Sequence, residues 1–136
     1  MELFATYCSA DKEAASGDLP AVERYVSERI SGAYANALSS GNRFAILSGR
    51  FGLIAPDTPI PHYDHLLQVN EMDAMVQRVT TTLKAWEVTT IRWFTVAFEM
   101  DPNVTRYRDV MSQSATQIGA EFEIELWEPT GMLGLI

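Results

Sequence analysis

Short apolar runs alternate with helical segments along this chain, and that alternation constrains its fold more than any other feature. Residues 3–7, 44–47 and 91–98 are nearly continuous apolar runs of the kind found in strands buried on both faces. Residues 121–126 alternate strictly between glutamate and apolar side chains, which is typical of a half-exposed strand at a sheet edge. We therefore predict four strands, the last of them at an edge.

Helical periodicity covers residues 18–41, 70–86 and 101–119, between the predicted strands. Asp18 and Asn70 have side chains that can cap the first turns of the first two segments. Glycines follow the first and third segments, where a left-handed residue commonly ends a helix. Three helices are predicted.

The resulting element order is β-α-β-loop-α-β-α-β. Alternating strands and helices imply a mostly parallel sheet with right-handed crossovers. We predict a single α/β domain over residues 1–136, three-layered and Rossmann-like, with a mostly parallel four-stranded sheet. The apolar segment 130–136 is expected to dock on the body of the domain or on a partner.

Residues 48–69 lack a clear periodicity and carry several glycines and prolines. A structureless stretch of this length is uncommon inside a compact domain and is more often functional than merely connecting. Proline restricts the backbone, so the segment is predicted to be a shaped, functional loop.

The charge balance is strongly acidic, with 18 acidic against 10 basic side chains and a net charge of −8. This balance disfavours broad non-specific binding to nucleic acid. Cys8 is the only cysteine, so no internal disulfide can form and a reducing compartment is expected. With no signal-peptide pattern and no apolar run of the roughly 20 residues that span a bilayer, we expect a cytoplasmic protein without a membrane partner.

Polar residues follow three of the predicted strands, at the points where these strands end. In open parallel sheets a ligand binds beyond the carboxyl ends of the strands, so these residues are expected to share one rim. Lys12 and Arg50 suit a phosphate, a carboxylate or a nucleotide. The candidate ligand-binding residues are Ser9, Lys12, Tyr25, Ser48, Gly49, Arg50, Gly52, His62 and Tyr63.

Cys8, Asp64 and Glu99 are the candidate catalytic residues. Glu99 ends a buried strand, where burial would favour the protonated form that acid–base work requires. Cys8 would act as a nucleophile only as a thiolate, which the nearby Lys12 cation would favour. Structural interpretations stand beside these roles: Cys8 as a small buried side chain, the serines as turn-closing hydroxyls and the lysine as a solvated charge.

Motifs that would identify a cofactor are missing. The chain contains neither a Gly-x-Gly-x-x-Gly fingerprint nor a P-loop, and no Gly-x-Ser-x-Gly elbow. His62 and His65 have His-x-x-His spacing, but no further ligand accompanies them, so no metal site is expected. We expect no cofactor.

Three blocks in the first half of the chain resemble a family of small bacterial and phage proteins whose functions are largely unassigned. Residues 8–12 match its Cys-Ser-x-x-Lys motif, residues 47–54 its Leu-Ser-Ala/Gly-x-x-Gly-Leu-Leu motif, and residues 63–64 the end of Pro-Tyr-Asp. The second block also resembles a segment of the YaaA peroxide-stress proteins, which are associated with DNA binding and with iron or oxidant damage. His62 stands where the family has proline, and the second half of the chain matches no motif.

The residues and motifs described above leave three functions open. The first is handling of a nucleobase, nucleoside or nucleotide at its N-glycosidic bond, with a small nucleotide-like or phosphorylated ligand as partner. The alternative that the resemblance implies is a non-catalytic nucleic-acid-binding protein of the stress response, which the net charge disfavours. The third is a protein-interaction module using residues 130–136, for which a homodimer is one arrangement. The residues alone leave open whether the domain is an enzyme.

Overall fold

A five-stranded sheet forms the centre of the molecule, with strand order β4-β3-β1-β6-β7. The computed structural model describes residues 1–97 and 101–127. The strands of this sheet are β1 (Glu2–Tyr7), β3 (Arg43–Ser48), β4 (Gly52–Ile54), β6 (Thr90–Thr95) and β7 (Glu121–Leu126). Neighbouring strands are parallel except for β4, which runs antiparallel to β3. The mostly parallel sheet predicted from the sequence is confirmed.

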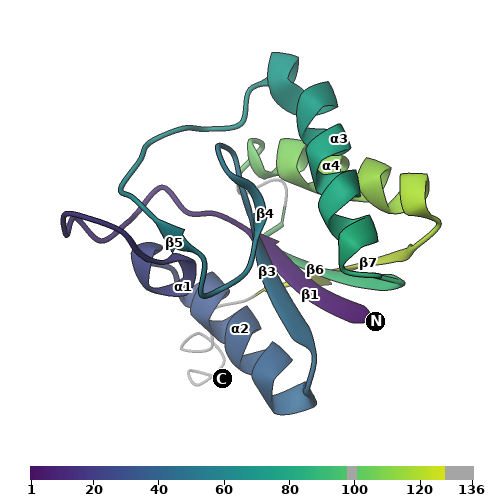
Figure 1. Cartoon of the computed structure of the whole chain (residues 1–136), viewed down its shortest axis with the longest axis horizontal. Helices are drawn as coiled ribbons and strands as arrows, with labels where there is room; N and C mark the ends of the chain where they lie inside the picture. The colour runs from purple at the N-terminus through teal and green to yellow at the C-terminus, as the bar shows by residue number, and fades with distance from the viewer. Residues whose placement is uncertain (98–100, 128–136) are drawn as a thin grey trace.

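Helices cover both faces of the sheet (Figure 1). The helices α1 (Ala21–Arg24) and α2 (Glu28–Ser40) lie on one face, and α3 (Met72–Ala85) and α4 (Val104–Ile118) on the other. A 3-10 turn, η1 (Val69–Glu71), leads into α3, and β2 (Leu19–Pro20) pairs with β5 (Pro59–Ile60) outside the main sheet. The α/β class is thus confirmed. None of the described helices combines the length and the hydropathy needed to cross a bilayer.

The first helical segment is divided in two, whereas the sequence predicted one continuous helix over residues 18–41. Tyr25 is extended after α1 (φ −82°, ψ 130°), and Ser27 then caps α2. The Val26 N–H donates to the Asp11 carbonyl at 2.9 Å, a bond that a continuous helix would not allow. As a consequence the Val26 side chain is 50% exposed.

The helix starts differ from the predicted caps, while the predicted ends are confirmed. Asp18 precedes β2 and caps no helix, and Asn70 lies inside η1. The helix α4 begins after a turn at residues 101–103. Gly41 and Gly119 end α2 and α4 in the left-handed conformation, at φ 72° and 70°.

Residues 48–69 do not form the structureless loop that the sequence predicted, because they contain β4 and β5. The Ser48 Oγ accepts the backbone N–H groups of Arg50 and Phe51, at 3.2 and 3.0 Å, and so closes the turn between β3 and β4. Gly52 begins β4 at a φ of 78°, a conformation that favours glycine. The strand β4, the fifth strand of the sheet, was not predicted because a glycine and two apolar residues are too few to show a pattern.

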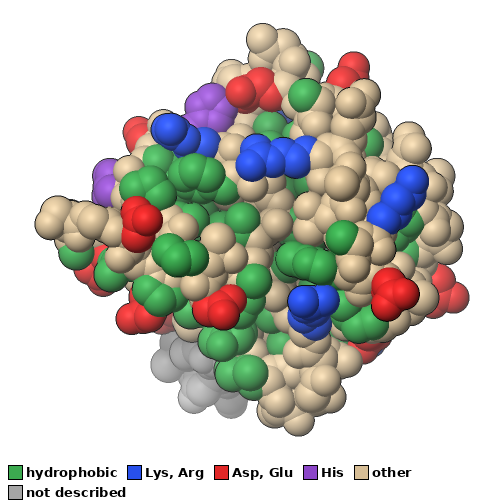
Figure 2. Space-filling model, in the orientation of Figure 1, with side chains coloured by type: hydrophobic (Ala, Val, Ile, Leu, Met, Phe, Trp, Pro, Cys, Tyr) green, Lys and Arg blue, Asp and Glu red, His purple; other side chains and the backbone are tan. Residues whose placement is uncertain are grey.

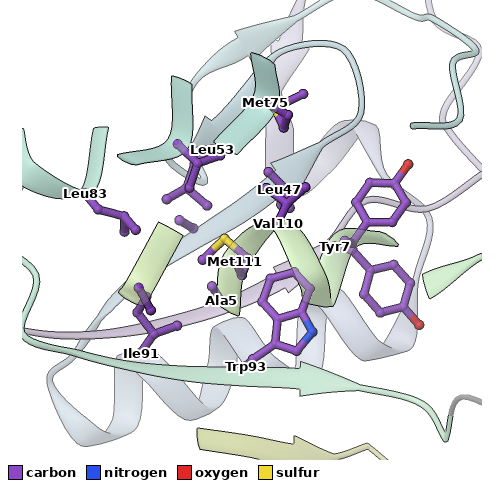
Figure 3. Close-up of a cluster of buried hydrophobic side chains, with 14 of the residues drawn as sticks. Ala5, Tyr7, Leu47, Leu53, Met75, Leu83, Ile91, Trp93, Val110 and Met111 are labelled. Atoms are coloured by element: carbon purple, nitrogen blue, oxygen red, sulfur yellow. The ribbon is translucent and has the colours of Figure 1, made fainter. Parts of the chain in front are cut away.

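Two hydrophobic clusters, one on each face of the sheet, form the core. Figure 3 shows the cluster under α3 and α4, where Leu47 and Trp93 of the sheet lie among Met75 and Met111 of the helices. Cys8, directly after β1, packs against both clusters. The carboxyl end of β1 therefore lies where the two halves of the core meet.

The strand β7 forms one edge of the sheet, as predicted. Arg92 of β6 lies 3.6 Å from both Glu123 and Glu125 of β7, so cross-strand ion pairs offset part of the repulsion between these glutamates. On the other face of the strand, Ile124 and Leu126 are 44% and 56% exposed. These two apolar side chains are therefore only partly covered and do not belong to the core.

Trp127, directly after β7, packs against α2. A Cβ atom placed on Gly32 would clash with its indole ring, so glycine at this helical position permits the contact. The segment 130–136, predicted to dock on the domain or on a partner, lies outside the described residues.

Candidate functional site

A pocket of about 510 Å³ opens at the carboxyl ends of β1 and β6. The chain leaves β1 through α2 toward β3, and it leaves β6 through α4 toward β7, so the connections diverge from the gap between β1 and β6. In open parallel sheets this divergence creates the crevice in which ligands bind. The pocket therefore lies beyond the carboxyl ends of the strands, where the sequence predicted a ligand site.

Four parts of the chain line this pocket, which we call the β1/β6 pocket. They are residues 7–10 with Lys12, Arg29 of α2, residues 64–66, and a group around the start of α4 comprising Val96, Asp101, Asn103, Val104 and Tyr107. Four of the predicted site residues come together here, namely Cys8, Ser9, Lys12 and Asp64.

Arg29 is the most deeply buried charge in the pocket wall, with only 8% of its surface exposed. Its Nη1 donates to Thr6 Oγ1 at 2.5 Å and to the Tyr7 carbonyl at 2.6 Å, and its Nη2 donates to the Cys8 carbonyl at 3.2 Å. Its Cζ lies 3.5 Å from the centroid of the Tyr7 ring. Burial lowers the pKa of Arg29, while Asp101 acts in the opposite direction without forming an ion pair.

Lys12 supplies a second positive charge to the pocket. Its Nζ lies 4.6 Å from the ring centroid of Tyr63 and 5.7 Å from that of Tyr25, and it donates to the Ala10 carbonyl at 3.4 Å. The backbone of Lys12 also bridges to that of Tyr25. Both cations of the pocket are thus held against aromatic rings, and neither forms an ion pair with a described carboxylate.

The pocket wall at residues 64–66 is held by hydrogen bonds on both sides. On one side Tyr63 is buried, and its hydroxyl bonds to other hydroxyls of the interior. On the other side the Leu67 N–H donates to Tyr107 Oη, and Arg106 Nη1 donates to the Leu67 carbonyl, both at 3.0 Å. A three-residue span between two anchored residues forms a preorganised wall.

Three buried hydroxyls form a chain beside the pocket. Tyr63 Oη lies 2.5 Å from Tyr25 Oη and 2.7 Å from Ser48 Oγ. Burial raises the pKa of Tyr25 to about 12, and it raises the pKa values of Tyr63 and Tyr107 further. These tyrosines therefore stay neutral at physiological pH. Tyr25, Ser48 and Tyr63, predicted to bind a ligand, are brought together in the interior and do not line the pocket.

His65, in the pocket wall, pairs with Glu71 of η1. Its Nε2 lies 2.9 and 3.0 Å from the two carboxylate oxygens of Glu71. The Gln68 N–H donates to the same carboxylate at 2.8 Å, and this bond together with His65 lowers the pKa of Glu71. The pair connects the pocket wall to the start of α3.

Cys8 and Ser9 occupy the end of β1. Cys8 is a half-buried free thiol whose Sγ lies 3.8 Å from Tyr107 Oη. Ser9 Oγ donates to the Asp11 carbonyl at 2.7 Å, which closes a turn. The proposed nucleophilic role of Cys8 stays a prediction.

Four other predicted residues lie away from the pocket lining. A Cβ on Gly49 would come within 2.9 Å of Tyr107 Oη, so this glycine lets the β3–β4 turn pack behind the pocket. Arg50 is exposed in that turn, and Gly52 follows it. His62 lines a separate open hollow beside residues 14–18.

Glu99, the third candidate catalytic residue, lies outside the described residues. Within residues 1–97 and 101–127, no three His, Cys, Asp or Glu side chains are grouped so that they could hold a metal ion.

Sequence reasoning missed Arg29, His65 and Tyr107 as pocket residues. A signal existed for Arg29, because it shares one helical face with Ala33 and Ala37, and an arginine on an apolar face is unusual. This signal was not recognised, because the sequence predicted one continuous helix over residues 18–41 instead of two helices. His65 and Tyr107 carry no local signal, because their place in the pocket depends on segments distant in the chain.

No protein-family model matches this chain, and neither a curated protein nor a solved structure matches it.

Proposed function

We propose that this protein binds a small nucleotide-like or otherwise phosphorylated ligand in the β1/β6 pocket. The observation that carries the proposal is the Arg29 guanidinium, which lines the pocket, is 8% exposed and forms no ion pair with a described carboxylate. Lys12 adds a second cation to the same wall.

The energetics of charge burial support this proposal. Removing an ion from water costs several kcal/mol even after relaxation, and a buried charge is normally paired. The three acceptors around Arg29 are a hydroxyl and two carbonyls, which satisfy N–H groups without neutralising the charge. Asp101 acts on Arg29 from beyond ion-pair distance, and no described carboxylate pairs with it, so a bound anion would supply a counter-charge in direct contact.

The size and lining of the pocket suit a mononucleotide or a pentose phosphate. Its volume of about 510 Å³ falls within the roughly 300–1,000 Å³ of typical small-molecule sites. Ser9, Asp64 and Asn103 place a hydroxyl, a carboxylate and an amide in the wall, groups that can bond to sugar hydroxyls or to a base. One face of the Tyr7 ring is already occupied by Arg29, so base stacking is not part of the proposal there.

Chemistry at an N-glycosidic bond remains the reaction that we propose for such a ligand. Hydrolysis of that bond transfers the sugar carbon from the base nitrogen to the oxygen of a water molecule, and the proton that the water loses goes to the departing base. Positive charge develops on the sugar in this step, and a nearby carboxylate stabilises it. Asp64 and Asp101 both line the pocket, and either can take this role.

Binding to nucleic acid, the function suggested by the YaaA resemblance, is less well supported. On the face seen in Figure 2, basic side chains lie apart from one another and form no continuous stripe. Duplex binding draws its affinity from many lysine and arginine contacts to phosphates. This chain has a net charge of −8 and only 10 lysine and arginine side chains that could make such contacts.

A thermal-shift screen tests the proposal with matched variants. Wild type, Lys12→Ala and Arg50→Ala would be heated with nucleobases, nucleosides, mononucleotides, pentose phosphates and short oligonucleotides. A ligand at 100 times its Kd adds roughly 2.7 kcal/mol to stability. We expect phosphorylated small molecules to stabilise wild type and Arg50→Ala, with at least tenfold weaker binding to Lys12→Ala. Arg50 is the control because it removes the same charge outside the pocket lining.

Two results would overturn this function. One is a lack of stabilisation by every phosphorylated small molecule. The other is equal affinity in Lys12→Ala and wild type. Stabilisation by oligonucleotides alone would favour the nucleic-acid-binding alternative.

A further inference from the structure

We propose that Arg29 binds two oxygens of one oxyanion, a phosphate monoester or a carboxylate, through its Nε and Nη2 nitrogens. This inference rests on the proposed function and names the ligand group that the pocket recognises. It assigns the specificity of the site to one residue of α2, whose role is geometric as well as electrostatic.

The donor count of Arg29 supports this assignment. A guanidinium group has five N–H donors in one plane and no acceptor. Two of them, on Nη1, are used by Thr6 Oγ1 and the Tyr7 carbonyl, and one on Nη2 is used by the Cys8 carbonyl. Two donors remain, on Nε and Nη2, and Nε is not among the fully buried side-chain atoms that lack a partner in the described part of the chain.

The remaining nitrogens are the pair through which arginine binds planar or tetrahedral oxyanions. Nε and Nη2 lie on one edge of the guanidinium, spaced to donate to two oxygens of the same phosphate or carboxylate. Because Arg29 lines the pocket, an oxyanion there could reach this edge. A lysine at position 29 could supply the charge but could not supply the paired donors.

The guanidinium is held in position before any ligand arrives. Its three hydrogen bonds reach consecutive residues of the chain at the end of β1, and its Cζ lies 3.5 Å from the Tyr7 ring centroid. The helix cap at Ser27 fixes the first turn of α2, from which Arg29 extends. Rotamer entropy is therefore lost during folding rather than on binding, which favours affinity.

Lys12 contributes differently. Its ammonium group lies over the Tyr63 and Tyr25 rings and acts as a compact charge without a fixed planar edge. We therefore expect Lys12→Arg to retain binding, whereas Arg29→Lys should lose it.

The test combines nuclear magnetic resonance on wild type with one charge-conserving variant. Protein labelled with 15N in arginine would be titrated with inorganic phosphate, AMP, adenosine and acetate, while the Nε–H signals of Arg29 and Arg24 are followed. Arg24 is the internal control, because its Nε already donates to the Ile60 carbonyl at 3.4 Å. Arg29→Lys identifies the Arg29 signal and is expected to bind AMP at least tenfold more weakly than wild type.

The outcomes separate this inference from the proposed function. A saturating shift of the Arg29 signal with phosphate and AMP, or with acetate, supports the inference and distinguishes the two oxyanion types. If AMP stabilises the protein but the Arg29 signal does not move, the inference is wrong and the proposed function survives. If none of the anions binds, the inference is wrong, and the proposed function is wrong as well when no phosphorylated compound of the thermal-shift screen stabilises the protein. Should Arg29→Lys fail to fold, the Arg29 Nε–H signal is assigned in wild type by through-bond correlation to its own backbone amide, and the wild-type titration then decides the question.

Discussion

Two buried arginines five residues apart differ in ways that separate a charge that cross-links the backbone from a charge that we propose binds a ligand. Arg24 ends α1 and is fully buried, while Arg29 lies in the first turn of α2 and is 8% exposed. Neither forms an ion pair with a described carboxylate. They differ in how many donors are occupied and in what lies beside them.

Arg24 uses its donors to connect distant parts of the backbone. Its Nη1 donates to the carbonyls of Glu13 and Ala15, its Nη2 to that of Gly17, and its Nε to that of Ile60, at 2.5 to 3.4 Å. Four carbonyl dipoles therefore converge on the guanidinium. Arg24 does not line the β1/β6 pocket and acts as a cross-link between residues 13–17 and β5.

Arg29 has three acceptors, two remaining donors and a pocket beside it. Burial of a positive charge is therefore not in itself a sign of a ligand site in this protein. The informative combination is a buried charge, incomplete hydrogen bonding and an adjacent cavity. Four experiments test this difference between the two arginines and the segments around them.

Replacing Arg24 with Met should have the largest effect on stability. Four backbone carbonyls would lose their buried donor, and we expect the free energy of unfolding to fall by about 3 kcal/mol, or roughly 10 °C in Tm. Urea denaturation measures this loss, with the exposed Lys84→Met as control. Stabilisation by phosphorylated ligands should persist in Arg24→Met. A loss below about 1 kcal/mol would show that Arg24 is no cross-link.

Tyr63→Phe should weaken the connection between the two regions. Tyr63 lies between β5, which Arg24 holds, and the pocket wall, and its hydroxyl bonds to Tyr25 and Ser48. Loss of this buried hydroxyl should cost about 2 kcal/mol of unfolding free energy. Tyr34→Phe is the matched control, because no hydrogen bond of its hydroxyl is found among the described residues, and it should change stability by less than about 0.5 kcal/mol. Equal effects of the two substitutions would contradict the chain of hydroxyls.

Alkaline pH should destabilise the hydroxyl chain. Burial raises the pKa of Tyr25 from 10.0 to about 12, so the folded state retains a proton that the unfolded state releases. The stability from this group is fully present below pH 10 and is lost as the pH rises through 12. For Tyr25 alone the loss near pH 11 is about 1 kcal/mol. Between pH 8 and 11 the urea midpoint should fall less steeply for Tyr25→Phe than for wild type. Identical slopes would refute the claim that Tyr25 causes the loss of stability at alkaline pH.

Glu71→Gln should have the smallest effect, confined to the acid side. The lowered pKa of Glu71 means that its bonds to Gln68 and His65 stabilise the fold above pH 4.5, and this contribution disappears as the pH falls through the lowered value. Both partners are partly exposed, so the effect on the urea midpoint should be small. As the pH falls below 4.5, the urea midpoint of Glu71→Gln should decrease less than that of wild type. The midpoint of the control Glu23→Gln, a substitution at an exposed residue, should decrease as it does in wild type. An unchanged acid limb would mean that the pair does not anchor the pocket wall.

The sequence predicted the α/β class of the fold and the place of Cys8, Ser9 and Lys12 at the carboxyl end of a buried strand, because both depend on local patterns. Buried parallel strands have continuous apolar runs, and the residues after such strands must share one edge. Cys8, Ser9 and Lys12 follow β1 directly, so their convergence was predictable. The position of Asp64 in the pocket was less predictable, because it depends on the path that residues 61–68 take through the folded protein.

Elements with weak local signals were not predicted. The strand β4 has only three residues, and the break at Tyr25–Ser27 is caused by a bond from Val26 to a distant carbonyl. Ser48 and Tyr63 were expected on the rim, yet their hydroxyls satisfy each other in the interior. Polar side chains near a strand end can face either way, and only packing determines which.

The amino-acid pattern alone was enough to predict the order of the main strands and helices, the mostly parallel pairing and which residues follow the carboxyl ends of the strands, because the periodicity of side chains is a local property of the backbone. Which polar groups face the pocket and which bond to one another in the interior follows from tertiary contacts alone. Arg24 and Arg29 are alike as residues, and their difference arises from the acceptors that distant segments bring to each. Donor satisfaction is a property of three-dimensional contacts, so it cannot be read from neighbouring residues in the chain.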